Sequence, residues 1–495
     1  MKTVNVDVLV CGGGMSGMAC AAFASAAGAK VLLVEKQSEV GGSSNYSAGM
    51  FWAPKNFASM REWVADGDPN LQQAWLQDYL PAVQWMRENG VPTSSRFGPI
   101  MTIGIGYPIK IKSLHNHHKQ RISSSKTESE ILLNSQVVKL IQEQPCLPGS
   151  SVTGAIIRTK SSQQDAPSYV LVNAKQVVLA TGGFQGSSEL RSTHLGPGGS
   201  DIFVRANAGS VGDGLTLATT VGAGLSRGLD TFYGHLMAAP VRKEDVSPSD
   251  YLPLAQYQSK YCILINEDGK RFVDETLGDE VVNQCLAKER GRRGFILFDE
   301  KSRAEHCVSA LFPNAGDIDR LEKARSYGCN VASADTLDQL CTILESWGVN
   351  GPQAKQTMDQ YLKAVGQGDS ATILEASVGK IGQPPRPLVE GQGPFYAMEV
   401  QPSITFTYGG VSIDTDGQAL TPDRKPINGL LVAGVDAGGF SNVTYAGGLA
   451  LAFVTGFWAA RTATRALNLQ EPKLPLPNPE DMEKEERSVV MRSQL

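Results

Sequence analysis

Residues 6–36 constrain the fold of this chain more than any other stretch. An apolar run over residues 6–11 leads into Gly12-Gly13-Gly14-Met15-Ser16-Gly17, then an alanine-rich run, then a second apolar run that ends at Glu35. A G-x-G-x-x-G turn between a strand and a helix, with an acidic residue after the next strand, is typical of a dinucleotide-binding βαβ unit. Because strand, helix, second strand and carboxylate all agree, we predict such a unit here.

Each part of this pattern has a physical role. We expect Gly12 to allow the tight turn, Gly14 to let the backbone approach a pyrophosphate, and Gly17 to let the helix lie close to the sheet. Glu35 can accept hydrogen bonds from a ribose, and the helix N-terminus favours an anion.

Composition excludes several classes of protein. A net charge of -5 argues against a nucleic-acid partner. None of the eight cysteines forms a C-x-x-C pair, so neither a zinc site nor a redox pair is indicated, and a reducing, cytoplasmic compartment is favoured. No run reaches the length of a transmembrane helix, so we expect no membrane span.

Three later stretches are candidates for contacts with the same cofactor. Residues 41–49 form a loop of small and hydroxyl residues directly after the second strand. Residues 174–179 predict a buried parallel strand that ends in a small-residue turn, and residues 207–214 open a helix with glycines, as suits a nearby phosphate.

Two other segments have a structural interpretation. Residues 57–90 carry helical apolar spacing around Trp75 and Trp85, which predicts core helices. His115, His117 and His118 lie close together, but neighbouring lysines and an arginine would repel a cation, so we expect a solvated basic loop instead of a metal site.

The character of the sequence changes between residues 231 and 388, where glycine turns become rare and charged helical sequence takes over. We therefore predict an α/β fold in which a Rossmann-type cofactor-binding domain (residues 1–230 and 389–495) is interrupted by an inserted α+β domain (residues 231–388). The inserted domain is expected to contain a strand at residues 261–265.

An ordered set of motifs along the chain closely resembles the FAD-dependent fumarate reductase and ketosteroid dehydrogenase superfamily. The motifs are Gly12 to Gly17, Glu35-Lys36 with Gly41-Gly42-Ser43-Ser44, Ala180-Thr181-Gly182-Gly183-Phe184, Gly212-Asp213-Gly214, Gly269-Lys270-Arg271-Phe272-Val273-Asp274-Glu275, Thr407-Tyr408-Gly409-Gly410 and Gly447-Gly448. The resemblance implies a flavin domain interrupted by a mobile capping domain, with the substrate held between them.

The resemblance also implies the residues that contact FAD, which we expect to be bound noncovalently because no histidine or cysteine occupies a recognisable flavin-linking motif. The implied cofactor-binding residues are Gly12, Gly13, Gly14, Ser16, Gly17, Glu35, Lys36, Gly41, Gly42, Ser43, Ser44, Ala48, Gly49, Val138, Ala180, Thr181, Gly182, Gly183, Asp213, Gly434, Asp436, Leu449 and Ala450.

The positions that are expected to determine substrate specificity depart from the fumarate reductase pattern. Tyr445 and Asp279 replace two arginines of that pattern, and Phe406 replaces a histidine. A dicarboxylate would lose its hydration here without fixed cations in return, which is strongly unfavourable. The ketosteroid dehydrogenases match better, because they carry a tyrosine at the position of Tyr445, where its hydroxyl donates a hydrogen bond to a ketone.

We therefore predict an FAD-dependent oxidoreductase that desaturates or reduces a C–C bond beside a carbonyl in an apolar, ketosteroid-like substrate. Hydride passes to or from flavin N5, Tyr445 polarises the carbonyl and Asp279 exchanges the proton. The alternatives are a double-bond isomerase, a soluble fumarate-reductase-like enzyme and a non-catalytic electron carrier. The electron partner is not identified, and the terminal residues 492–495 resemble a peroxisomal address, although an ordinary tail is favoured.

Overall fold

The computed structural model describes residues 1–100, 103–159, 167–310, 316–366, 393–478 and 480. The chain divides into two compact units, each discontinuous in sequence. The first unit comprises Met1–His194, Ala206–Phe232 and Phe406–Leu495, and the second comprises Leu195–Arg205 and Tyr233–Thr405.

The first unit is built on a mixed sheet with helices. Its strands are β1 (Lys2–Cys11), β2 (Val31–Val34), β3 (Met50–Pro54), β4 (Phe97–Ile100), β5 (Gly104–Pro108), β6 (Glu130–Leu132), β7 (Ser135–Gln142), β8 (Val152–Thr159), β9 (Ser168–Leu179), β20 (Phe406–Thr407), β21 (Gln418–Leu420) and β22 (Pro426–Val432). Its helices are α1 (Met15–Ala26), α2 (Phe57–Trp63), α3 (Pro69–Glu88), α4 (Ile111–Ser123), α5 (Ser188–Leu195, which ends one residue into the second unit), α6 (Asp213–Thr220) and α13 (Gly448–Ala466).

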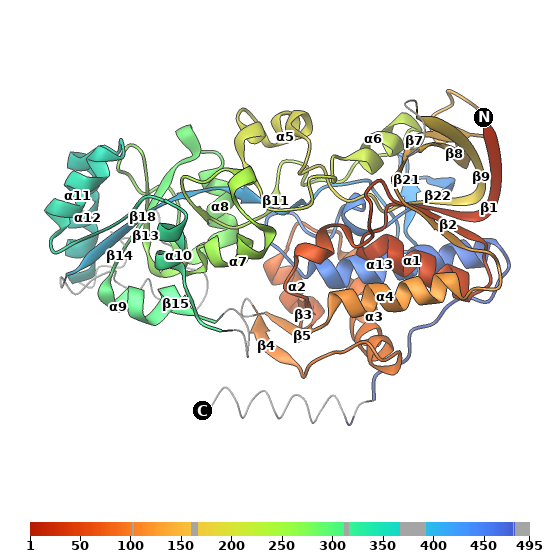
Figure 1. Cartoon of the computed structure of the whole chain (residues 1–495), viewed down its shortest axis with the longest axis horizontal. Helices are drawn as coiled ribbons and strands as arrows, with labels where there is room; N and C mark the ends of the chain where they lie inside the picture. Colours follow the sequence, from red (N-terminus) through yellow and green to blue (C-terminus); the bar gives the residue numbers. More distant parts are fainter. Residues whose placement is uncertain (101–102, 160–166, 311–315, 367–392, 479, 481–495) are drawn as a thin grey trace. The chain divides into compact units, whose positions relative to one another are not determined.

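The main sheet of this unit has the order β21-β22-β9-β1-β2-β6, and the β7-β8 hairpin joins it through β9. All neighbours from β22 to β6 run parallel. Helix α1 lies against α13 and α4, as Figure 1 shows. Alanines and Gly17 make α1 narrow, so its backbone approaches both the sheet and α13 closely, and residues 15–25 are all buried.

The second unit has its own sheet and core. Its strands are β10 (Phe203–Val204), β12 (Met237–Ala238), β13 (Ile263–Asn266), β14 (Gly294–Asp299), β15 (Val308–Ser309), β16 (Ile318–Asp319), β17 (Val331–Ala334), β18 (Phe395–Gln401) and β19 (Ser403–Ile404), and β11 (Phe232–Tyr233) begins at the boundary. Its helices are α7 (Tyr251–Leu254), α8 (Asp279–Leu286), α9 (Glu300–Ser302), α10 (Arg320–Ser326), α11 (Leu337–Ser346) and α12 (Gly351–Gly366). The sheet order is β12-β18-β14-β13, with β17 also paired to β18, and the expected strand near residues 261–265 is β13.

The boundaries of the units differ from the predicted ones in two places. Residues 195–205 belong to the second unit, and so do the described residues between 393 and 405, which were assigned to the cofactor-binding domain. The reason is β18, which pairs with the whole length of β14 and is buried within the second unit's sheet. Residues 393–405 are close in sequence to the glycine-rich final segment, and for this reason they were assigned to the cofactor-binding domain.

The histidine-rich segment is not the solvated basic loop that we predicted. It forms α4, in which His115 and His118 are 3% and 0% exposed. Their spacing places them on the helix face that also carries Leu114 and Ile122, while Lys119 lies exposed. Burial lowers the pKa of His115 to about 4 and that of His118 well below its ordinary value. No group of three potential metal ligands occurs within the part of the chain that the structure describes.

No helix among the described residues is both long enough and apolar enough to cross a membrane. The terminal residues 492–495, which resemble a peroxisomal address, lie outside the described residues.

Candidate active site

Four parallel strands of the first unit end in one row. Cys11 of β1 pairs with Val34 of β2 and with Leu179 of β9, and Leu179 also pairs with Val432 of β22. The residues that follow these strand ends therefore meet at one edge of the sheet, where doubly wound folds bind their ligands. The predicted cofactor residues from Gly12, Glu35, Ala180 and Gly434 onward are brought together at this edge.

The three glycines of the first turn differ in how closely they are packed. A Cβ atom on Gly12 would lie 2.3 Å from the Ala180 carbonyl oxygen, and one on Gly17 would lie 1.9 Å from the Gly12 carbonyl oxygen. A Cβ atom on Gly14, in contrast, would meet no atom of the protein within 4 Å. Gly12 and Gly17 are thus required by close packing, and Gly14 leaves a space at the N-terminus of α1 that fits a pyrophosphate.

Glu35 closes one side of this site. Its carboxylate is buried, with Oε2 accepting a hydrogen bond of 2.7 Å from the Gly13 amide and Oε1 accepting one of 2.8 Å from the Gln37 amide. Each carboxylate oxygen can accept a further hydrogen bond, so the residue is able to receive ribose hydroxyls. Lys36 beside it forms a 2.6 Å ion pair with Asp213 at the start of α6, which ties two predicted cofactor segments together.

The loop at residues 41–49 contains a short 3-10 helix, Gly42–Tyr46, and lies against the first turn. The Gly41 amide donates a hydrogen bond of 2.8 Å to the Gly13 carbonyl. The Ser43 hydroxyl is buried and has no hydrogen-bond partner among the described residues, as expected of a group that contacts a polar cofactor. Ala48 is exposed, and a Cβ atom on Gly49 would lie 2.4 Å from the Ile109 carbonyl oxygen, so Gly49 is required for packing.

His115 supports this loop from α4, a role that the sequence analysis missed. Its Nε2 lies 2.8 Å from the Ser44 hydroxyl, which donates to the Gly41 carbonyl, so His115 Nε2 is a donor to Ser44. No signal in the sequence links these residues, which are 71 positions apart.

The buried Asp436 carboxylate is paired with Thr181, which follows β9. The Asp436 carboxylate accepts hydrogen bonds from the Thr181 amide and hydroxyl, and a Cβ atom on Gly214 would lie 2.4 Å from it. Burial raises the pKa of Asp436 to about 7, against the opposing effect of the Thr181 hydrogen bonds. The side chain of Asp436 therefore orders the turn after β9, and its predicted contact with the cofactor stays a prediction.

The remaining predicted cofactor residues lie in different settings. A Cβ atom on Gly434 would lie 2.4 Å from the Ser16 hydroxyl, so these two positions adjoin. Gly182 has a positive φ of 87°, and a Cβ atom on Gly183 would lie 2.4 Å from the Thr407 hydroxyl. Leu449 and Ala450 lie in the first turn of α13. Gly42 is the first residue of the short 3-10 helix after Gly41. Val138 lies at an irregularity of the β7-β8 pairing with a 38% exposed side chain.

Tyr445, just before α13, is set among aromatic residues of the first unit. Its ring lies 5.2 Å from that of Trp52 and 5.8 Å from that of Phe406, both edge to face, and it is half-buried. The Trp63 indole donates a 2.9 Å hydrogen bond to the Tyr445 carbonyl, which fixes the backbone at this position. The Tyr445 ring is thus flanked by two aromatic rings.

Asp279 is the first residue of α8 in the second unit. Before it, the predicted motif at residues 269–275 forms a rigid turn, because Arg271 makes a two-point ion pair with Glu275 and Glu275 also accepts the Leu264 amide at 2.9 Å. The Asp279 carboxylate is hydrogen-bonded to Nδ1 of His235, and Nε2 of His235 lies 2.8 Å from the Tyr233 hydroxyl. His235 and Tyr233 were missed by sequence reasoning, since nothing in the sequence relates them to Asp279.

Two further polar side chains lie near this group. The Tyr257 ring lies 4.6 Å from that of His235, and Arg205 is near enough to interact electrostatically with both residues. Arg205 is 8% exposed, and its buried Nη1 has no hydrogen-bond partner among the described residues.

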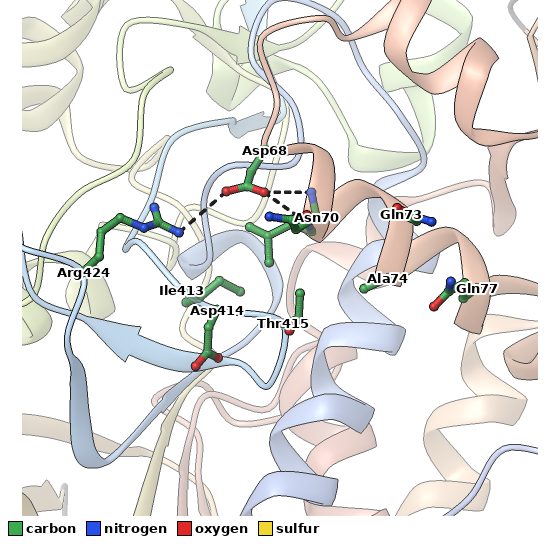
Figure 2. A pocket seen from close by; sticks show the side chains of 10 residues that line it. Asp68, Asn70, Gln73, Ala74, Gln77, Ile413, Asp414, Thr415 and Arg424 are labelled. Atoms are coloured by element: carbon green, nitrogen blue, oxygen red, sulfur yellow. Dashed lines mark hydrogen bonds and ion pairs between the residues drawn. The ribbon is translucent and has the colours of Figure 1, made fainter.

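A hollow of about 430 Å³ lies elsewhere on the first unit, between α3 and residues 413–424. Figure 2 shows it with Asp68 and Arg424 facing each other across 3.8 Å. None of the predicted site residues lines it, and Asp68 is occupied as the N-cap of α3, so we assign the hollow no part in the chemistry.

Comparison with known proteins agrees with this geometry. A family model described as an FAD binding domain matches residues 7–451. Urocanate reductase of Eggerthella lenta is 27% identical over 461 residues, covering 88% of this chain and 70% of that protein. A cytochrome-type fumarate reductase of Shewanella frigidimarina is 25% identical over 480 residues, covering 92% of this chain and 76% of that protein.

Among solved structures, the 3-ketosteroid delta1-dehydrogenase of Sterolibacterium denitrificans, in complex with 1,4-androstadiene-3,17-dione, has the same fold. It superposes with a TM-score of 0.71 at 18% identity, covering 93% of this chain and all of that one. The chain therefore belongs to the FAD-binding family of oxidoreductases acting on CH–CH groups that includes the fumarate reductases and the ketosteroid dehydrogenases, and its cofactor is FAD.

Proposed function

We propose that this protein desaturates, or in the reverse direction reduces, a C–C bond beside a carbonyl in an apolar substrate. The observation that carries the proposal is the aromatic setting of Tyr445, between the rings of Trp52 and Phe406. A tyrosine flanked by aromatic rings suits a neutral, apolar ketone, because the rings offer apolar contact area and a hydroxyl can donate a hydrogen bond to the carbonyl oxygen.

Tyr445 has two tasks in this proposal. Its hydroxyl donates a hydrogen bond to the substrate carbonyl, which acidifies the neighbouring C–H bond and stabilises the negative charge that develops on the oxygen. The flat rings beside it provide apolar contact area for a hydrophobic substrate. Bound FAD supplies the hydride acceptor or donor.

The proton is exchanged by the group around Asp279 in the second unit, which we propose to be the substrate-capping unit. Asp279 is held by His235, so it does not stand alone as a solvated turn carboxylate. A carboxylate paired with an imidazole is a common device for moving protons at neutral pH.

Anaerobic flavin spectroscopy tests the proposal. The protein is reduced with dithionite and mixed with 2-cyclohexenone or androstenedione, and the return of the oxidised flavin spectrum is followed. We expect both enones to reoxidise the flavin with formation of the saturated ketone. An enone that moves its double bond without net flavin oxidation would identify an isomerase, and failure of both enones to reoxidise the flavin would refute the proposal.

A second candidate is the reduction of an unsaturated carboxylic acid. The observation in its favour is Arg205, whose buried Nη1 has no partner among the described residues and could bind one carboxylate oxygen. The names of urocanate reductase and fumarate reductase point to substrates of this class for those relatives. Including cinnamate and fumarate in the reoxidation assay decides between the candidates, because an enoate-specific enzyme would leave cyclohexenone untouched.

A further inference from the structure

The polar side chains of the second unit form an ordered hydrogen-bonded group that includes Asp279. Tyr233, His235 and Asp279, which we call the Tyr-His-Asp triad, are joined by two hydrogen bonds through the imidazole ring. His235 in the middle is buried, with 3% of its side chain exposed, whereas 13% of the Asp279 side chain is exposed and Tyr233 is half-buried. The triad therefore connects two partly accessible ends through a buried ring.

The direction of the hydrogen bonds follows from their chemistry. An ionised carboxylate can only accept, so Nδ1 of His235 carries a proton and donates it to Asp279. Burial lowers the pKa of His235 below its ordinary value, with Arg205 acting in the same direction and Asp279 opposing them. The imidazole is thus neutral at neutral pH, and its Nε2 accepts the hydrogen bond from the Tyr233 hydroxyl at 2.8 Å.

We propose that the Tyr233 hydroxyl, activated by His235 and Asp279, is the group that exchanges a proton with the substrate carbon. The inference rests on the proposed function and names its proton-transferring atom. It also changes the role of Asp279 from the base itself to a positioning residue that fixes the tautomer of His235 and stabilises the imidazolium. The logic is that of a hydroxyl–histidine–carboxylate triad, with a phenol in place of an alcohol.

The proton movements balance in both directions. In desaturation, the C–H proton passes to the Tyr233 oxygen while the Tyr233 proton passes to Nε2 of His235, and the hydride of the adjacent carbon leaves to oxidised FAD. The imidazolium that results carries one positive charge beside the negative charge of Asp279. In reduction each movement is reversed, so that Tyr233 protonates the carbon and is reprotonated by His235.

Two features of the site favour Tyr233 over Asp279 as the exchanging group. Asp279 stands at the N-terminus of α8, where a negative charge is stabilised, and its carboxylate is already engaged by Nδ1 of His235. The guanidinium groups of Arg205 and Arg320 also lie near the triad. Arg205 interacts electrostatically with His235, and Arg320 with Asp279. A phenol gains basicity when it passes its proton to His235. The two nitrogens of His235 face Asp279 and Tyr233, whereas Tyr257 contacts the imidazole through its ring.

The test compares four forms of the FAD-loaded protein: wild type, Tyr233→Phe, Asp279→Asn and the control Tyr257→Phe. Flavin absorbance and melting temperature first establish that each form is folded and loaded. Stopped-flow reoxidation of the dithionite-reduced flavin by 2-cyclohexenone is then measured. We expect Tyr233→Phe and Asp279→Asn each to slow reoxidation by about 10²-fold or more, in the range of general acid–base catalysis, and Tyr257→Phe to stay within a few-fold of wild type.

Histidine nitrogen-15 NMR provides a readout that does not depend on turnover. The His235 signal is assigned by its loss in His235→Gln. We expect a neutral imidazole protonated at Nδ1 in the wild type, and a loss of this preference in Asp279→Asn, because an asparagine amide can offer its N–H groups to Nδ1. A wild-type His235 protonated at Nε2 would overturn the triad.

The two proposals fail in different ways. If Tyr233→Phe reoxidises as fast as the wild type while Asp279→Asn is slow, Asp279 is itself the proton-transferring group and the inference is wrong. If no enone or enoate reoxidises even the wild type, the proposed function fails, and the inference fails with it.

Discussion

Gly14 and Gly17 provide a matched pair of substitutions that separates cofactor binding from packing. Both lie in the first glycine turn, yet a Cβ atom on Gly17 would lie 1.9 Å from the Gly12 carbonyl oxygen, whereas one on Gly14 would meet no protein atom within 4 Å. Gly17→Ala therefore forces α1 away from the turn by more than an ångström. Overpacking of this kind costs about 1–3 kcal/mol or more.

Gly14→Ala should leave the stability of the apoprotein almost unchanged. Gly14 has φ -73° and ψ -169°, which alanine adopts without strain. Alanine is a poorer N-cap than glycine, but this loss is offset by about 0.4–1 kcal/mol from the reduced freedom of the unfolded chain. The added methyl group instead occupies the space that fits a pyrophosphate, so we expect the Kd for FAD to rise at least about tenfold, equivalent to about 1.4 kcal/mol.

The assay measures two quantities on each protein. Urea unfolding of the apoprotein, followed by circular dichroism, gives the free energy of unfolding, and titration with FAD, followed by quenching of flavin fluorescence, gives the Kd. Gly17→Ala should lower both stability and affinity, and Gly14→Ala only affinity. Wild-type affinity in Gly14→Ala would refute the assignment of the pyrophosphate to this turn.

Three further predictions concern the cofactor, the carbonyl anchor and the buried carboxylate. FAD should leave the polypeptide on acid denaturation, and flavin that precipitates with the protein would disprove noncovalent binding. Tyr445→Phe should lower kcat/KM for an enone by about 10- to 10³-fold through loss of one hydrogen bond to developing charge, with the exposed Tyr169→Phe as control, and equal kinetics in both variants would exclude Tyr445 as the anchor. Because burial raises the pKa of Asp436 to about 7, its contribution to apoprotein stability is complete below the ordinary pKa of aspartate and is lost as pH rises through about 7. Asp436→Asn should flatten the pH dependence of the unfolding free energy over that range by up to a few kcal/mol, since one pKa unit corresponds to about 1.4 kcal/mol, and an unchanged pH dependence would contradict this origin.

Local sequence was sufficient for the βαβ unit, because each of its constraints acts over short distances. The close approach at Gly17 is to Gly12 within the same motif, although Gly12 itself also packs against Ala180, which is distant in the sequence. The order of the motifs along the chain also identified the family. These motifs follow the ends of parallel strands, and the strand ends meet at one edge of the sheet.

The contacts between distant segments could be found only in the tertiary structure. His235 and Asp279 are 44 residues apart, and His115 and Ser44 are 71 apart, so neither pairing leaves a periodic or spacing signal in the sequence. The membership of β18 in the second unit depends likewise on its pairing with β14, about 100 residues earlier in the chain. Local propensity determines which segments form strands and turns. The partner of a polar side chain or a strand edge is instead determined by the packing of the whole unit, which in this protein brings His235 against Asp279.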